Sequence, residues 1–268
     1  MAKLIHLSDL HFGDPLLSWG LLRSQGQIFS KQSIGLVNHL ANQHRHFDPK
    51  KKELLIENLV TIDWDIIVIT GDLVHLGTKA EFKLARTMLE PLIQKGTVLL
   101  TAGNHDRYTP KTLGRIEDTF GDCYPFNQSS PCVFEGPNQW GLIELPMARP
   151  SGLWAKGKFS GQFEEYKQLI ERRGKKPTLL YGHYPLYHPP GRSERFGHQL
   201  WNLENVRALT QLPGIKGYLH GHMHESWAFQ PAGTDLWSIN AGGSLKDGYW
   251  SLQLAEQGIF PSKQPLQF

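Results

Sequence analysis

Residues 97–106 have the sequence TVLLTAGNHD, an apolar run followed at once by glycine and polar residues. The run is typical of a buried strand, and Gly103 with the polar residues after it is typical of a loop leaving that strand's carboxyl end. Asn104 offers an amide oxygen suited to a metal ion or a phosphate proton, while His105 offers a ring that exchanges protons near neutral pH. The stretch therefore predicts a strand-end site at which two adjacent side chains do different chemistry.

Two earlier segments also place an acidic residue at the end of a predicted strand. Residues 3–8 lead into Asp9 and His11, whose alternate spacing puts both side chains on the same side of the chain. Residues 65–70 contain the uninterrupted run IIVI, as expected for a strand buried on both faces, and lead into Gly71 and Asp72. Each strand thus delivers a potential metal ligand to its carboxyl end.

Helices are expected between these strands, at residues 49–61 and 78–95. The order strand, helix, strand, helix, strand favours parallel pairing with right-handed crossovers. In such sheets, ligands bind at the carboxyl ends of the strands.

The second half of the chain alternates further helix and strand candidates. Helices are expected near residues 111–120, at 160–173 with Ser160 as the N-cap, and at 203–212, and strands at 140–145, 178–181 and around 218–219. The strand at 178–181 leads into Gly182 and His183, and the one at 218–219 leads into the run HGHMH. The tail, with strand candidates at 226–230, 236–240 and 249–254, predicts an antiparallel second layer.

The strand-end residues form a mixed set of oxygen and imidazole ligands. The set suits manganese, iron or zinc better than calcium or magnesium. It has more members than one such ion usually takes from a protein, so it divides naturally between two ions that share a carboxylate. The members are Asp9, His11, Asp72, Asn104, His183, His222 and His224.

The chain resembles the calcineurin-like metallophosphoesterase superfamily, whose ordered signature is D-x-H, G-D, G-N-H-D/E, G-H and G-H-x-H. The matching blocks occur in the family's order, each after a strand candidate, and span most of the chain. They begin at Asp9, Gly71, Gly103, Gly182 and Gly221.

The resemblance implies an α/β fold, with two facing mixed β-sheets flanked by helices in an αββα sandwich, as one domain over residues 1–268. It also implies two divalent transition-metal ions, Mn, Fe or Zn, with Asp72 as the bridge. One ion would be held by Asp9, His11, Asp72 and His224, and the other by Asp72, Asn104, His183 and His222.

The resemblance further implies that a hydroxide shared by the two ions attacks phosphorus in line. His105 is then the catalytic residue, which stabilises the transition state or protonates the departing oxygen. Asn104 and Arg107 are candidates for substrate binding, although Arg107 could equally cap its loop. Asp106 is expected to orient a neighbouring group.

The remaining histidines and several tryptophans are expected in ordinary structural positions. Of the histidines, His220 adjoins the ligand run, and we expect it to lie just behind the ligands. No basic, aromatic-interleaved stripe surrounds the tryptophans, so we expect them to pack rather than to stack on bases. These residues are His6, His39, His44, His46, His75, His188, His198 and His220, together with Trp19, Trp154 and Trp201.

Residues 14–47 form a hydrophobic and basic insertion, expected to be helical, that admits two interpretations. Apolar residues at helical spacing and the basic side chains of Arg23, Lys31 and Arg45 are typical of a cap that receives an acyl chain or rests on an anionic membrane. The same pattern is also typical of an amphipathic helix packed on the core, which we favour.

Composition excludes several classes of protein. With 40% hydrophobic and 20% charged residues the chain is typical of a globular protein, and a formal charge of +3 is too small for a dedicated nucleic-acid binder. The two cysteines, Cys123 and Cys132, lack the spacing of a zinc finger. Apolar segments are too short for a signal peptide or a membrane span, so we expect a cytoplasmic protein, with peripheral contact to the inner face of a membrane as the alternative.

These observations predict a metal-dependent phosphoesterase that hydrolyses a small-molecule phosphodiester or pyrophosphate, of the cyclic-nucleotide or nucleotide-sugar type. A narrower alternative is a UDP-2,3-diacylglucosamine-type pyrophosphatase of lipid A synthesis, acting on a lipid-linked substrate. An alternative of another class is a non-catalytic scaffold that kept the fold for protein binding.

Overall fold

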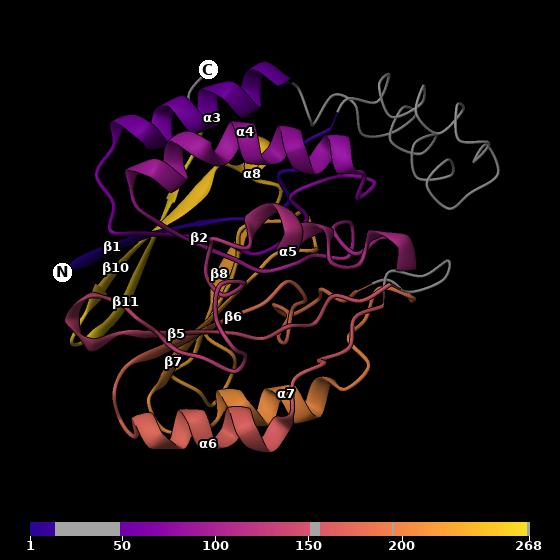
Figure 1. Ribbon diagram of the computed structural model, residues 1–268. Coiled ribbons are helices and arrows are strands. Elements are labelled where there is room, and N and C mark those ends of the chain that lie inside the picture. The colour runs from indigo at the N-terminus through magenta and orange to yellow at the C-terminus, as the bar shows by residue number, and fades with distance from the viewer. Residues whose placement is uncertain (14–48, 151–155, 195, 267–268) are drawn as a thin grey trace.

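The computed structural model describes residues 1–13, 49–150, 156–194 and 196–266. Two β-sheets lie face to face, and helices cover the outer face of each sheet (Figure 1). The expected insertion at residues 14–47 lies outside the described residues. The predicted α/β fold with two facing mixed sheets is confirmed.

The first sheet combines parallel strands from the start of the chain with antiparallel strands from its end. Its order across the sheet is β11 (Gly258–Gln264), β10 (Tyr249–Ala255), β1 (Ala2–Leu7), β2 (Ile66–Ile69) and β3 (Thr97–Leu100). β1, β2 and β3 run parallel to one another, as the strand and helix order predicted, while β10 runs antiparallel to β1.

The second sheet is built mainly from the second half of the chain. Its order is β4 (Phe134–Glu135), β5 (Gly141–Glu144), β6 (Thr178–Tyr181), β7 (Ile215–His220), β9 (Trp237–Asn240) and β8 (Trp227–Phe229). β5, β6, β7 and β9 are parallel.

The tail does not form one antiparallel layer, and that prediction is wrong. β8 and β9 join the second sheet, whereas β10 and β11 join the first. β1 has β2 on one side only, and the antiparallel pairing with β10 satisfies the backbone groups on its other side.

Helices flank the sheets at top and bottom in Figure 1. On the first sheet lie α3 (Pro49–Thr61) and α4 (Lys79–Lys95), and on the second α6 (Phe163–Arg173) and α7 (Leu203–Thr210). Shorter helices are α5 (Arg115–Phe120), α8 (Ser244–Asp247) and the 3-10 turns Pro110–Thr112 and Pro137–Gln139. In the described part of the chain, no helix is both long and apolar enough to cross a bilayer.

The helix starts follow local capping chemistry. Thr78 and Glu81 form a capping box at the start of α4, in which each side chain accepts from the other's backbone N–H. Ser160 is not the N-cap of α6, contrary to prediction. Its hydroxyl donates to the carbonyl of Pro146, and Gln162 occupies the cap position.

Alternate residues of the central strands supply different cores. In β2, Ile67 and Ile69 pack with α3 and α4, whereas Ile66 and Val68 face the second sheet. This explains why the strand is apolar at every position. A third core fastens α6 and α7 to the outer face of the second sheet.

Candidate active site

The strand ends of both sheets bring all seven predicted ligand residues together. Parallel strands end at the same edge, so side chains that follow β1, β2, β3, β6 and β7 meet there although the chain separates them widely. These side chains are Asp9, His11, Asp72, Asn104, His183, His222 and His224.

The backbone of this edge is strained. Five of the seven non-glycine residues with positive φ in the described chain are predicted ligands. Such residues cost on the order of 1–3 kcal/mol each and cluster at functional sites. They are Asp9 (54°), His11 (45°), Asp72 (52°), His222 (72°) and His224 (53°).

The glycines of the motifs are required by close approach of the backbone to these ligands. A Cβ on Gly103 would overlap Oδ1 and the backbone nitrogen of Asp72. A Cβ on Gly221 would overlap the hydroxyl of Ser8 and Oδ2 of Asp9. The motif glycines therefore let four loops pack in two pairs at the site.

One group of ligands surrounds Asp9. His224 Nε2 lies 3.2 Å from Asp9 Oδ1, and His11 Nε2 lies 3.9 Å from the same oxygen and 3.3 Å from His224 Nε2. With an oxygen of Asp72, these ligand atoms all lie within 4.8 Å of one another. The group has the size and the donors of a site for one cation.

A second group surrounds Asn104. Its Oδ1 lies 3.0 Å from His183 Nε2 and 2.9 Å from His222 Nδ1, and the two ring nitrogens are 3.3 Å apart. The other ring nitrogens face backbone carbonyls, His183 Nδ1 that of Thr70 at 2.8 Å and His222 Nε2 that of His198 at 3.1 Å. A carbonyl only accepts, so these bonds turn a lone pair of each ring toward Asn104.

Asp72 lies between the two groups. Its Oδ1 accepts the backbone N–H of His105 at 2.8 Å. Its Oδ2 lies 3.8 Å from His11 Nε2 in the first group and 3.4 Å from His183 Nε2 in the second. One carboxylate oxygen thus faces both groups.

Burial and charge set the protonation states here. Burial raises the pKa of Asp72, but the charges of His183 and His105 outweigh it and hold the pKa well below its usual value. Burial lowers the pKa of His183, yet the Asp72 carboxylate brings it to about 9. Burial, followed by nearby histidine charge, lowers the pKa of His11 and His222 well below the usual value. Anionic carboxylates and neutral imidazoles are the forms that bind metals, and a cation beside Asp72 would displace the proton of His183.

A buried acceptor also fits a cation. Asp9 Oδ2 accepts the backbone N–H of His222 at 3.0 Å, whereas buried Oδ1 faces the ring nitrogens of two other predicted ligands, His224 at 3.2 Å and His11 at 3.9 Å. A buried carboxylate charge is costly unless a cation is paired with it. The residues therefore fit a pair of metal ions.

His105 lies beside the predicted metal ligands, and its ring contacts the backbone and the ring of His75. His105 Nδ1 lies 2.6 Å from the carbonyl oxygen of His75, and the two rings stack at 5.1 Å. His11, His75 and His105 also place a ring nitrogen each within 4.8 Å of the others. His75 is buried, in agreement with the structural position expected for it, and its carbonyl and ring also position His105.

The two residues after His105 hold the loop. Asp106 is buried, and its carboxylate accepts the backbone N–H groups of Val74 and Gly103. Burial and the charge of Asp72 raise its pKa to about 7. The guanidinium of Arg107 forms an ion pair with Glu117.

Other predicted structural residues have mixed outcomes. His220 is buried, with Nε2 3.1 Å from the hydroxyl of Ser238, which is not a predicted ligand. Trp201 was expected to be a packing residue, but 62% of it is exposed, and the guanidinium of Arg149 lies 4.7 Å from its ring centroid. Trp19, Trp154, His39, His44 and His46 lie outside the described residues.

Comparison with known proteins agrees with this geometry. The family model described as calcineurin-like phosphoesterase matches residues 2–226. Two relatives, each called a probable cyclic nucleotide phosphodiesterase, are both 25% identical to the chain. The protein from Ruthia magnifica subsp. Calyptogena magnifica aligns over 76% of this chain and 79% of its own, and that from Vesicomyosocius okutanii subsp. Calyptogena okutanii (strain HA) over 87% and 83%.

Solved structures share the fold at low sequence identity. A dimetal phosphatase from Danio rerio superposes with a TM-score of 0.67 at 13% identity, covering 99% of this chain and 96% of that one. A putative 5'-nucleotidase from Staphylococcus aureus gives a TM-score of 0.57 at 16% identity, covering 99% of this chain and 54% of that one.

Proposed function

The chain belongs to the calcineurin-like phosphoesterase family, and we propose that it hydrolyses a small-molecule phosphodiester of the cyclic-nucleotide type. The family and the two-sheet fold make it a metal-dependent phosphoester hydrolase. The observation that carries the substrate class is the pair of relatives called probable cyclic nucleotide phosphodiesterases, which align over most of the chain.

We assign the two groups of ligands to two ions, Mn, Fe or Zn. One group is Asp9, His11, Asp72 and His224, and the other is Asp72, Asn104, His183 and His222. Support comes from Asp72 Oδ2, which faces a histidine nitrogen of each group at 3.8 and 3.4 Å. Two such ions supply positive charge that acidifies a water nucleophile and neutralises the phosphoryl oxygens.

In this proposal His105 is the catalytic acid. Its Nδ1 is engaged with the His75 carbonyl, so Nε2 is the atom that gives a proton to the leaving oxygen as the P–O bond breaks. Asn104, whose Oδ1 lies against His183 and His222, stays a candidate for substrate contact as well as for metal binding. The pairing of Arg107 with Glu117 supports its role as a brace of the loop rather than a substrate contact.

The alternatives gain less support. The lipid-linked substrate depended on residues 14–47, which lie outside the described residues, and the two relatives named above carry no lipid in their names. A non-catalytic scaffold would not need the strained backbone at five ligand positions.

A substrate panel tests the proposal. Manganese-, iron- and zinc-loaded protein would be assayed against bis-p-nitrophenyl phosphate, 3',5'-cyclic AMP, 3',5'-cyclic GMP and a UDP-sugar. We expect turnover of the first three. Turnover of the UDP-sugar alone would move the substrate class to pyrophosphates, and no turnover with any metal would favour the scaffold.

A further inference from the structure

An exposed aromatic side chain, three residues after the His198 carbonyl that faces His222, has two cations against it. Trp201 keeps 62% of its surface exposed, which is unusual for the largest apolar side chain. The guanidinium of Arg149 lies 4.7 Å from its ring centroid and Lys156 Nζ 5.5 Å away, within cation–π range. We call Trp201, Arg149 and Lys156 the rim surface.

The cations of the rim surface lie against aromatic rings, and Lys156 Nζ is also 5.1 Å from the ring centroid of the exposed Phe196. Within the part of the chain that the structure describes, neither Arg149 nor Lys156 takes part in an ion pair. Arg149 Nε is buried and has no hydrogen-bond partner there. Two positive charges held against an aromatic ring, with no carboxylate to balance them, favour an anionic ligand.

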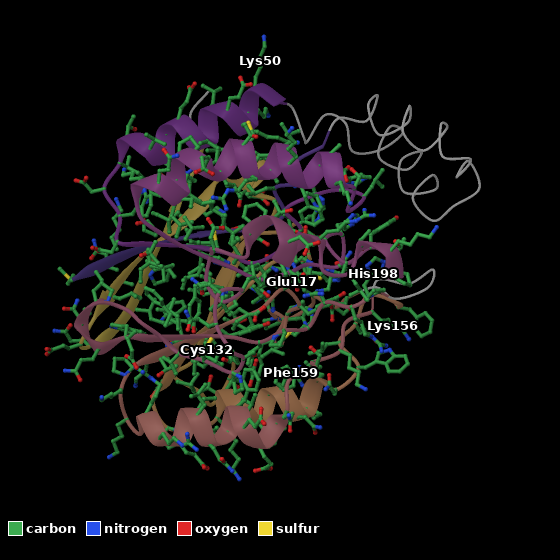
Figure 2. The ribbon with its side chains drawn as sticks, viewed as in Figure 1. Lys50, Glu117, Cys132, Lys156, Phe159 and His198 are labelled. Carbon is green, nitrogen blue, oxygen red and sulfur yellow. The ribbon has the colours of Figure 1, made fainter. Side chains whose placement is uncertain are left out.

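The rim surface is continuous with the metal site. The carbonyl of His198 lies 3.1 Å from Nε2 of the predicted ligand His222, and the two rings are 5.7 Å apart. Trp201 follows His198 by three residues, which span at most about 11 Å. Figure 2 shows His198 and Lys156 at the same end of the molecule.

A second set of contacts links the rim surface to the metal site. The backbone N–H of Trp201 donates to the carbonyl of Gly157 over 3.1 Å. A Cβ on Gly157 would lie 2.5 Å from the ring of Tyr184, whose centroid is 4.5 Å from that of His222.

We propose that the rim surface binds the base of a nucleotide whose phosphate lies at the metal site. This rests on the proposed function and names the part of the substrate that the metals do not contact. Every base has a π face that can stack on Trp201, and one such stack is worth about 1–3 kcal/mol. Arg149 and Lys156 add cation–π contact to the same ring and attract the phosphate.

The test compares two ligands that differ only in the base. AMP and ribose 5-phosphate would be titrated calorimetrically into the full-length, manganese-loaded protein. The wild type is expected to bind AMP about 5- to 150-fold more tightly than ribose 5-phosphate. Trp201→Ala should abolish this preference while leaving the affinity for ribose 5-phosphate unchanged.

Two variants serve as controls. Trp201→Phe keeps a π face and should keep most of the preference for AMP. Phe260→Ala removes another exposed aromatic ring, on β11, and should change neither affinity. The proposal would be overturned if Trp201→Ala lowered the affinities for AMP and ribose 5-phosphate by the same factor. It would also be overturned if the wild type bound the two equally.

The substrate panel separates this proposal from the proposed function. If cyclic nucleotides are hydrolysed but Trp201→Ala keeps the preference for AMP, the base lies elsewhere and the function stands. If only bis-p-nitrophenyl phosphate is hydrolysed while the preference for AMP depends on Trp201, base binding at the rim surface is supported and hydrolysis of cyclic nucleotides is not.

Discussion

The carbonyl oxygen of His75 accepts a hydrogen bond from Nδ1 of His105 over 2.6 Å. Because a carbonyl has no proton to give, Nδ1 carries one, and the proton that His105 exchanges with a substrate must reside on Nε2. The ring of His75 stacks on that of His105 at an interplanar angle of 27°, so the orientation as well as the tautomer is fixed.

Replacing His105 should slow the chemistry without releasing metal. His105→Asn removes the proton donor but none of the side-chain atoms in the two ligand groups, and a positioned general acid contributes about 10²- to 10⁴-fold. We expect kcat for bis-p-nitrophenyl phosphate to fall by that factor, with metal content by mass spectrometry unchanged. His188→Asn, at a half-buried histidine outside the ligand groups, is the matched control.

Replacing Asn104 should have the opposite signature. Asn104→Ala removes the oxygen that faces His183 and His222, at 3.0 and 2.9 Å. One of two bound ions should therefore be lost on dialysis, while the ion held around Asp9 is kept. Equal metal loss in Asn104→Ala and His105→Asn would refute the division between these neighbours.

A methyl group at Gly103 should disrupt the site although it deletes nothing. The added Cβ would overlap the carboxylate and backbone of Asp72, and overpacking of this kind costs about 1–3 kcal/mol. We expect Gly103→Ala to lower the melting temperature and to lose both ions. Gly243→Ala adds the same atom where nothing lies within 4 Å, and it should retain full metal content.

The positions of the predicted ligands could be read from the sequence because the information is local. Asp9, Asp72 and Asn104 each come two to four residues after the end of a short apolar strand, and parallel strands carry such residues to one edge whatever the details of packing. The division of the tail strands between two sheets had no comparable signal in the sequence. Apolar and polar side chains alternate along each strand in the same way whichever sheet it joins.

The rim surface escaped prediction for a related reason. The cations against Trp201 come from Arg149 and Lys156, in a segment about fifty residues earlier, and not from Arg207, which is close to it in sequence. What joins the segments is backbone pairing, with the N–H of Trp201 donating to the carbonyl of Gly157. A surface assembled from segments so far apart in sequence can be recognised only in the folded structure.

Glu144 should destabilise the protein above neutral pH. Burial raises its pKa to about 7, while the hydrogen bond from Thr101 over 2.6 Å opposes the rise. Between the unfolded value near 4.5 and pH 7 the folded state holds more protons, so stability falls as pH rises through this window. Glu144→Gln keeps an acceptor for Thr101 without the charge.

Urea unfolding of both proteins at pH 5 and pH 8 checks this. The variant should be more stable than the wild type at pH 8, with the difference shrinking at pH 5. A constant difference would show that the carboxyl group does not change its charge in this range.

His6 should make the protein sensitive to acid. It is fully buried, with Nε2 3.0 Å from the hydroxyl of Thr70, and burial together with the charge of Lys263 lowers its pKa to about 3. The unfolded chain takes up this proton near pH 6.5, so the stabilising contribution is present above that pH and is lost as pH falls toward 3. At pH 5, about 1.5 pH units into this window, the loss is about 2 kcal/mol.

His6→Gln isolates this effect, because the other buried histidines titrate equally in both proteins and cancel in the difference. Although the variant starts from a lower stability at pH 7, its free energy of unfolding should fall about 2 kcal/mol less than that of the wild type between pH 7 and pH 5. Parallel curves would mean that the ring is protonated on folding or that water reaches it, and the C2 proton shift of His6, expected to stay constant between pH 5 and 8, distinguishes the two.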